Sequence, residues 1–432
     1  MKFKTYTSIQ YGFSVDYPSK WAVKEHAAMF LASFVEDPTN EQSCSINITI
    51  QNLDVKMTQQ QLLEVSIQQI QSINAQDIET GSCTIGKYKG DFLQYYAPEQ
   101  RIKNKQCFFI KDSSVYIVSY TSSFKNFKSR IHYLDQCCES FKQFTPKGYK
   151  YAQFEAFTST VKNVNNETVY YQYWTPKAWK TSKKEKEGNK QVQEYKDQAN
   201  DLQLKVEFES LTQKGDETTT DKKHQNNRTH LIYTNSKHNC LFTIDFSFPK
   251  EDEETSSSWE PIFKRIVADS KIETSHLVSP IYDRFYNFIF RYYVNLPKSF
   301  ELDNRSSNTT SMIFIDKEYP HYPVFNITME DLGVAIPLEK YKEILLSFYT
   351  TSVQGARIIN EENSRLDKYR ALRINMDGRD PEIDKKCKVI IQCAVVKRTK
   401  GLLLNVRLPS EIFEEKIKKY FYMFYSLVFY KN

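Results

Sequence analysis

Four side chains that can ligate zinc lie close together near the middle of the chain, at His224, His230, His238 and Cys240. Structural zinc sites in proteins use four imidazole or thiolate ligands of this kind. Here the successive spacings of six, eight and two residues match no common zinc finger, and lysine and asparagine crowd the segment. We therefore expect a solvated polar segment, and the sequence leaves open whether it binds a metal.

A second segment with chemical potential is Gly86-Lys-Tyr-Lys-Gly90, whose glycines and lysines could approach a phosphate group. It lies between two predicted strands, a position typical of a tight turn. The sequence contains no P-loop, no G-x-G-x-x-G, no G-x-S-x-G and no H-E-x-x-H pattern. Phosphate binding, hydrolase chemistry and zinc-protease chemistry therefore lack their usual sequence anchors.

Eight cysteines are spread over the chain, and only Cys137 and Cys138 are adjacent. Because the chain has no C-x-x-C pair, a disulfide framework is disfavoured and reduced thiols are expected. Cys107, Cys387 and Cys393 fall in apolar, strand-like stretches that are typical of a core. No cysteine is associated in the sequence with a particular histidine, so nothing indicates an activated thiolate. We predict a protein that is not an enzyme, with no catalytic residue, no cofactor and no assigned metal ligand.

The composition is that of a packed globular protein, with 432 residues of which 40% are hydrophobic, 14% aromatic and 26% charged. A chain of this length is expected to form about two to four cores. The net charge of +6 is spread along the sequence. It permits docking on an acidic partner, and it is not concentrated as in nucleic-acid-binding proteins, so we expect no nucleic acid.

The two ends of the sequence bear on localisation. Met1–Gln10 lacks the apolar core of a signal peptide. The most apolar stretch, Tyr420–Tyr430, is far shorter than the ~20 residues of a membrane-spanning helix. We therefore expect a cytoplasmic protein with no membrane span, in which Tyr420–Tyr430 forms a buried last helix.

The strongest signal in the sequence is an internal repeat. Three times, an aromatic-rich run ends in a proline that is followed three residues later by an aromatic residue: Pro18 and Trp21, Pro176 and Trp179, and Pro297 and Phe300. Apolar residues then alternate at 28, 30 and 32 residues after each proline: Ile46, Ile48 and Ile50; Leu204, Val206 and Phe208; and Phe325, Ile327 and Met329. Alternation at identical offsets predicts the same half-buried strand in three copies of one fold.

Trp21, Trp179 and Phe300 are the candidate site residues of this repeat. Large aromatic side chains dominate the binding energy of many protein interfaces, so the three could anchor a partner. The alternative is that each packs in the core of its own copy, against that copy's helix. The sequence supports either interpretation.

Helices are expected at matching places in the first and third copies. Thr58–Ile73 carries apolar residues at helical spacing, and so does the segment opened by Pro337, where Tyr341, Ile344, Leu345 and Phe348 are expected on one face. In the second copy, Glu209–Arg228 is polar and aperiodic, so we expect a loop in place of this helix. Closing helices are expected over Ile131–Phe144, Trp259–Val267 and Ile412–Phe429.

The run Phe13-Ser-Val-Asp-Tyr-Pro-Ser-Lys-Trp and the later Cys138-Glu-Ser-Phe-Lys resemble the PsbP-like family, which includes the extrinsic photosystem protein and the Mog-type Ran-binding nuclear import factor. The resemblance is good over the first copy, moderate in the third, and limited to the register in the second. It implies an α+β protein of three tandem α/β/α sandwich units, residues 1–146, 147–276 and 277–432, each an antiparallel sheet flanked by helices. The middle unit would lack its central helix, and the resemblance brings no catalytic residue with it.

These observations favour a non-enzymatic structural or adaptor protein, a scaffold that docks on a large eukaryotic assembly. Three linked weak contacts would reinforce one another through effective concentration. An acidic filament such as the tubulin wall of a ciliary, axonemal microtubule would suit the mildly basic charge. The alternatives are a Ran-type GTPase-binding or transport cofactor, and an enzyme with a site between units.

Overall fold

The computed structural model describes residues 2–27, 30–40, 43–53, 56–112, 114–146, 148–187, 190–211, 217–250, 259–277, 280–303, 307, 310–319, 323–332, 335–381 and 384–430. Of the residues that the structure describes, 58% lie in strands and 18% in helices. Ordinary globular domains contain less than half this share of strand. The chain is therefore an α+β protein dominated by antiparallel sheets, as the sequence predicts at this coarse level.

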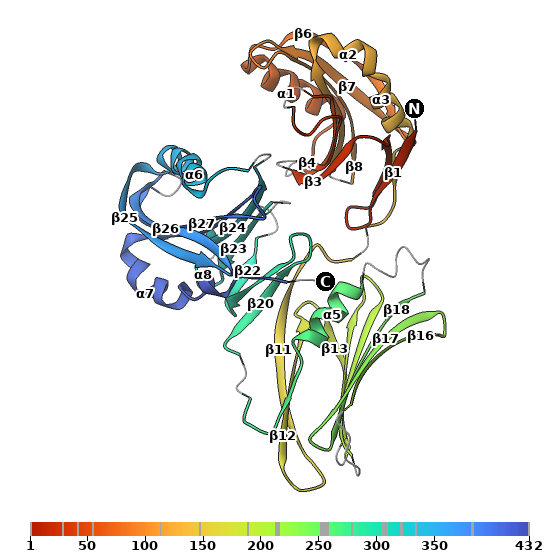
Figure 1. Ribbon diagram of the computed structural model, residues 1–432, viewed down its shortest axis with the longest axis vertical. Helices are drawn as coiled ribbons and strands as arrows, with labels where there is room; N and C mark the ends of the chain where they lie inside the picture. The colour runs from red at the N-terminus through yellow and green to blue at the C-terminus, as the bar shows by residue number, and fades with distance from the viewer. Residues whose placement is uncertain are drawn as a thin grey trace. The chain divides into compact units, whose positions relative to one another are not determined.

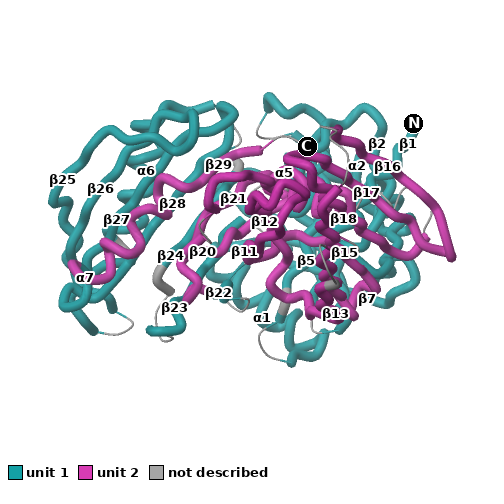
Figure 2. Tube along the Cα trace, turned by 90° about the horizontal axis from the view of Figure 1, so that it is seen from below, with its two compact units in different colours: residues 1–146, 301–413 teal, residues 147–300, 414–432 magenta. Residues whose placement is uncertain are grey.

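The chain divides into two compact units, which Figure 2 distinguishes by colour. One unit comprises residues 1–146 and 301–413, and the other comprises residues 147–300 and 414–432.

The N-terminal part of the first unit contains a small sheet and a large sheet. The small sheet has the order β1 (Phe3–Ser8), β2 (Phe13–Pro18), β10 (Lys142–Gln143). The first large sheet has the order β3 (Ala22–Ala27), β4 (Phe30–Val35), β5 (Ser45–Asn52), β9 (Ser114–Ser123), β8 (Ile102–Lys111), β7 (Tyr88–Ala97), β6 (Gln76–Ile85). Helices α2 (Phe124–Arg130) and α3 (His132–Ser140) follow β9.

Helix α1 (Gln59–Ser72) connects β5 to β6 and packs on one face of the first large sheet through Ile70. Its start is set by a capping box. The Thr58 side chain accepts a hydrogen bond from the Gln61 amide, and the Gln61 side chain accepts one from the Thr58 amide. These bonds satisfy two amides that the helix leaves without partners, so the predicted helix over Thr58–Ile73 is confirmed.

The rest of the first unit forms the third large sheet. Its order is β22 (Phe300–Leu302), β23 (Ser311–Asp316), β24 (Pro323–Asp331), β28 (Lys400–Pro409), β27 (Lys385–Val396), β26 (Tyr369–Asp380), β25 (Gln354–Leu366). Helix α6 (Leu338–Ser352) packs on one face, where Tyr341, Leu345 and Tyr349 join the core that includes Ile374 and Ile391. Helix α7 (Ser410–Tyr420) follows β28.

The second unit contains two six-stranded sheets. The second large sheet has the order β13 (Lys180–Glu187), β14 (Lys190–Asp197), β15 (Leu202–Ser210), β18 (Cys240–Pro249), β17 (Arg228–Lys237), β16 (Glu217–Gln225). The other, which we call the joined sheet, has the order β19 (Lys271–Glu273), β12 (Thr168–Pro176), β11 (Tyr151–Lys162), β20 (Tyr282–Asn287), β21 (Tyr292–Pro297), β29 (Val428–Phe429). One aromatic core that includes Tyr171, Tyr173, Phe208 and Phe242 lies between them, together with α5 (Glu260–Ala268).

The three large sheets share one strand order. In each sheet the third strand in sequence pairs with the last strand, and the remaining strands follow in reverse order. The third strands are β5, β15 and β24, which contain the alternating apolar residues of the repeat. All of these residues except Ile50 are buried. The predicted half-buried strand is therefore confirmed at all three places.

The closing helix expected over Ile131–Phe144 is shorter than predicted: α3 ends at Ser140, and Lys142–Gln143 pairs with β2. Two further local predictions are wrong. Glu209–Arg228 is not a loop throughout, because Glu217–Gln225 forms β16, which pairs with β17 over its whole length although every side chain is exposed. Tyr420–Tyr430 is not one helix: α7 ends at Tyr420, α8 covers Met423–Ser426, and Val428–Phe429 pairs with β21. In both segments the pairing is decided by backbone hydrogen bonds to a partner strand, which leave little trace in local hydrophobic periodicity.

Candidate functional site at the outer edge of the third large sheet

Strand β25 forms the outer edge of the third large sheet. It is 13 residues long, most of its side chains are exposed, and it pairs with β26. Within the part of the chain that the structure describes, no strand pairs with its other edge. The register shifts between Gln354 and Arg357 and again between Ile358 and Asn360. Such bulges twist an edge strand and are frequent at sheet edges and near functional sites.

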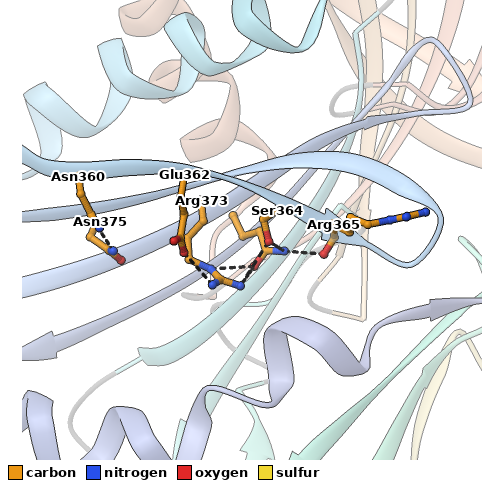
Figure 3. A network of polar contacts seen from close by, with 7 residues as sticks. Asn360, Glu362, Ser364, Arg365, Arg373 and Asn375 are labelled. Carbon is orange, nitrogen blue, oxygen red and sulfur yellow. Dashed lines mark hydrogen bonds and ion pairs between the residues drawn. The ribbon is translucent and has the colours of Figure 1, made fainter.

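The buried side chain of Arg373 links β25 to β26 and β27 by hydrogen bonds. Arg373 lies on β26, on the face opposite α6, because Leu372 and Ile374 on either side of it pack with that helix. Its Nη1 donates to Glu362 Oε1 at 2.9 Å, and its Nη2 donates to Gln392 Oε1 at 3.0 Å. Figure 3 shows the guanidinium lying between Glu362 and Ser364 of β25.

Gln392 of β27 completes this network. Its amide nitrogen donates to Ser364 Oγ at 3.0 Å and to the main-chain oxygen of Arg365 at 2.8 Å. Arg373 is 4% exposed and Gln392 is fully buried. Since a buried charge is costly without partners, this fully hydrogen-bonded arrangement makes the edge strand rigid.

Two further polar pairs run along the same two strands. Asn375 donates to Asn360 Oδ1 at 2.5 Å. Arg357 donates to both oxygens of Asp377, at 2.7 and 2.8 Å, and these hydrogen bonds hold the pKa of Asp377 below its usual value. The β25–β26 pair is thus held by side chains as well as by its backbone ladder.

Helix α6 is fixed beside β25 by an ion pair. Lys342 Nζ lies 3.0 Å from Glu361 Oε1 of β25, and hydrogen bonds to Glu339 and Glu361 raise the pKa of Lys342. The Tyr341 hydroxyl of α6 donates to Glu330 Oε1 of β24 at 2.8 Å. Figure 1 shows α6 and β25 side by side.

Four side chains of these two elements are apolar and exposed. Phe348 is 63% exposed, Ile359 57%, Ile344 50% and Ile358 48%. We call these four residues the α6–β25 surface. The sequence predicts Tyr341, Ile344, Leu345 and Phe348 on one face of this helix, but of these four only Tyr341 and Leu345 are buried. The core beneath α6 is filled by one narrow stripe of the helix, so the neighbouring apolar positions remain outside it.

The equivalent helix of the first large sheet provides a comparison. Val65 and Ile344 are separated by 279 residues, the same spacing that separates Pro18 from Pro297. With that spacing, Phe348 corresponds to Gln69, an exposed glutamine on α1. The exposed aromatic residue is therefore particular to α6. An exposed cluster of this kind beside an open strand edge can bind protein by apolar contact and strand pairing.

The three aromatic residues singled out in the sequence lie in separate cores. Trp21 and Phe300 each pack on a residue of a closing helix, with ring centroids 5.4 Å from Tyr133 and 5.0 Å from Tyr420. Trp179 stacks 5.9 Å from Phe246, and its indole N–H donates to Tyr149 Oη at 2.7 Å.

All three of these side chains are at most 5% exposed. In this conformation Trp21, Trp179 and Phe300 contribute to packing and offer little surface to a partner.

The four candidate zinc ligands lie on the last three strands of the second large sheet and their turns. His224 Nδ1 lies 3.1 Å from Thr229 Oγ1, and His230 Nδ1 lies 2.9 Å from Asp245 Oδ1. His238 is in a turn and Cys240 is buried. Among the residues that the structure describes, no three histidine, cysteine or acidic side chains converge as metal ligands would.

Sequence reasoning missed a cluster of three thiols in the first large sheet. Cys83, Cys107 and Cys138 form a chain of hydrogen-bonded sulfurs. Hydrogen bonding to Cys107 together with burial raises the pKa of Cys83, and hydrogen bonding to Cys138 together with burial raises the pKa of Cys107. A reactive cysteine needs a lowered pKa, so these thiols have the opposite character. Nothing in the sequence signals the cluster, because the three residues come from β6, β8 and α3.

Within the Gly86–Gly90 segment, Gly86 and Lys87 form the hairpin turn between β6 and β7, and Gly86 has a φ of +55°. Glycine adopts such a backbone without strain, which explains its presence there.

Of the helices in the described ranges, none has both the length and the apolar character needed to cross a bilayer.

No protein-family model and no curated protein sequence matches this chain. Among solved structures it is similar to the cyanobacterial PsbP protein CyanoP from Synechocystis sp. PCC 6803, with 12% identity, a TM-score of 0.27, and coverage of 33% of this chain and 92% of that one. It is also similar to PA94 from Pseudomonas aeruginosa, a protein of unknown function, with 9% identity, a TM-score of 0.23, and coverage of 32% and 92%.

A third similar structure is the T6SS immunity protein TplEi from Pseudomonas aeruginosa. The identity is 7% and the TM-score 0.28, with coverage of 99% of this chain and 97% of that one. Similarity at these levels suggests a PsbP-like fold only weakly, and it carries no information about function.

Proposed function

We propose that this chain is a non-enzymatic adaptor built from three tandem PsbP-like units, residues 1–146, 147–276 and 277–432, that docks on a larger protein assembly. The shared strand order of the three large sheets supports the tandem arrangement. The second large sheet has one strand fewer and, in its described residues, no helix between β15 and β16, in keeping with a diverged middle unit.

The α6–β25 surface is the observation that carries this proposal. Its apolar side chains are held on a helix and a strand that the Lys342–Glu361 ion pair and the Arg373 network make rigid. A rigid apolar surface loses little conformational entropy on binding, which is the condition for a good protein interface. Helix α1 contains no aromatic residue, which supports a specific role for Phe348 on α6.

The character of the buried thiols supports a binding function over a catalytic one. Burial or hydrogen bonding raises the pKa of each of the following: Cys83, Cys107, Cys137, Cys138, Cys240, Cys387 and Cys393. At neutral pH these groups are therefore protonated thiols that stabilise cores and are poor nucleophiles.

An acidic filament, such as an axonemal microtubule in the cytoplasm of a ciliated cell, is the assembly that we propose first. The net charge of +6 favours encounter with an acidic surface, and the attraction weakens as salt screens it. Weak contacts from linked units would add through effective concentration.

Co-sedimentation with microtubules tests this proposal. We expect the full chain to sediment with microtubules at low ionic strength and to be released by added salt. Phe348→Asp should lower the bound fraction several-fold, whereas Gln69→Asp, which adds the same charge at the matching position of α1, should not. No binding at low ionic strength would remove the microtubule as partner.

Affinity purification from the native cell tests the adaptor role itself. Proteins that bind through the α6–β25 surface should be recovered with the wild-type chain and with Gln69→Asp, and should be depleted with Phe348→Asp. Identical recovery with all three chains would refute a docking role for this surface.

A further inference from the structure

Small three-stranded sheets recur in the chain beside the large ones. The order β1-β2-β10 is repeated by β11-β12-β19 and by β20-β21-β29 within the joined sheet. The hairpins have the same register, because the prolines that end β2, β12 and β21 lie opposite Phe3, Phe154 and Tyr282. These three residues therefore occupy equivalent positions.

The second and third of these small sheets pair with each other through their first strands. β11 and β20 are antiparallel, with Ala152 opposite Tyr286 and Phe154 opposite Arg284. The pairing converts two three-stranded sheets into one six-stranded sheet. The equivalent strand of the first small sheet, β1, pairs with β2, and within the described ranges no strand lies against its other edge.

The hydrogen-bonding direction of β1 follows from its neighbour. The Ser19 amide donates to the Lys2 oxygen, just as the Lys177 amide donates to the Gln153 oxygen at the equivalent place in the second copy. Because an antiparallel ladder alternates, the main-chain groups of Phe3, Thr5 and Thr7 are directed away from β2.

Each of those outward-directed residues has a counterpart that is paired in the joined sheet. On β11 the equivalent of Phe3 is Phe154, and on β20 the equivalents of Thr5 and Thr7 are Arg284 and Tyr286. All three of these counterparts lie in the β11–β20 ladder. An open row of main-chain donors and acceptors is a template for another strand.

We propose that the outer edge of β1 binds an extended segment of a partner protein as an added antiparallel strand, with an acidic residue of that segment opposite Lys4. The site goes beyond the proposed adaptor function, since it lies on a different sheet and its binding would stand if that function failed. Six residues of β1 would span about 20 Å of the added strand.

The charge of β1 selects the partner. Extended by one residue beyond the Phe154–Arg284 pair, the β11–β20 register places Lys4, the equivalent of Glu155, opposite a residue equivalent to Asp283. Such a pair has no main-chain hydrogen bonds, and its side chains are closest. An acidic residue there would face the exposed Lys4. In a second copy of this chain, Lys4 would face Lys4, and like charges directly opposite each other destabilise a strand pair.

A peptide copying Pro280–Asn287 is a defined probe, because it contains β20, the strand that pairs with β11 in the joined sheet, and it contains Asp283. Its fluorescence anisotropy would be measured while the full-length protein is titrated. We expect saturable binding that weakens at least tenfold with Thr5→Pro, because proline lacks the outward-directed amide. Asp16→Ala removes the same Thr5–Asp16 side-chain hydrogen bond and should leave binding within twofold of wild type.

Charge exchange provides the second test, and it does not depend on the folding of the proline variant. A peptide with Asp283→Lys should bind the wild-type protein more weakly than the original peptide, and Lys4→Glu should reverse this preference. Equal binding by wild type and Thr5→Pro would mean that the peptide binds elsewhere, for example by displacing β20, and would overturn the proposal. So would a peptide preference that Lys4→Glu leaves unchanged, or self-association of the chain that Thr5→Pro abolishes.

Discussion

Replacing Gln392 by leucine should loosen the outer edge of the third large sheet. The side chain is fully buried, accepts hydrogen bonds from the Arg373 guanidinium and donates to Ser364 and Arg365. Leucine has a similar size, so the change removes hydrogen bonds without leaving a large cavity.

The magnitude follows from the groups left unpaired. A hydrogen bond to a charged group contributes about 1.5–3 kcal/mol, and a buried main-chain oxygen without a partner costs about 1–3 kcal/mol. Allowing for partial relaxation, Gln392→Leu should destabilise the β25–β26–β27 region by about 3 kcal/mol. The double variant Arg373→Met with Gln392→Leu should recover part of that loss, because it removes the buried charge together with its acceptor.

Native-state hydrogen exchange is the suitable assay, because a chain with two compact units need not unfold in one step. About 3 kcal/mol corresponds to roughly hundredfold faster exchange of amides that open with β25. Amides of the second large sheet serve as an internal control and should not change. Two results would refute the idea that the buried charge of Arg373 needs Gln392 as its hydrogen-bond acceptor. One is an unchanged exchange rate in Gln392→Leu, and the other is faster exchange in the double variant than in the single variant.

Three further predictions concern other parts of the chain. Gly12→Ala should destabilise the protein by more than Gly355→Ala, because both glycines have positive φ but only the former has backbone atoms where a Cβ would lie; equal losses of about 1 kcal/mol in urea unfolding would contradict this. Burial raises the pKa of Cys240 from 9.0 to about 11, so the contribution of this thiol to stability is complete below pH 9 and declines as the pH rises through 11. Cys240→Ala should flatten that decline, and parallel profiles of stability against pH for the variant and the wild type would contradict this prediction. Tyr341→Phe should cost about 1 kcal/mol through loss of the hydrogen bond to Glu330, and a Glu330→Gln background should reduce the difference, as a double-mutant cycle would measure.

Local patterning was sufficient to predict the strands at the centre of the large sheets. The alternation through Leu204, Val206 and Phe208 reports a strand with one buried face, and its recurrence after Pro18 and Pro297 identifies the equivalent strands. The capping box at Thr58 likewise marks the start of a helix from residues that are neighbours in the sequence. These features are local, so they can be recognised without the fold.

The candidate site was not predictable in the same way. Arg373 and Gln392 are ordinary polar residues in the sequence, and they become a buried pair only when β26 and β27 lie side by side. The spacing of apolar residues in α6 indicates a helix, but it does not show which of these residues the sheet buries. The sheet beneath it accommodates Tyr341 and Leu345 and leaves Phe348 outside.

The sequence by itself determined the periodicities: where strands alternate, where helices begin, and that one pattern occurs three times. Only the tertiary structure decided which edges are closed and which remain open, for example that β11 pairs with β20 whereas β1 pairs with β2 alone among the described strands. The physical reason is range. Alternation and capping depend on residues a few positions apart, whereas edge pairing and helix burial depend on which distant segments come into contact.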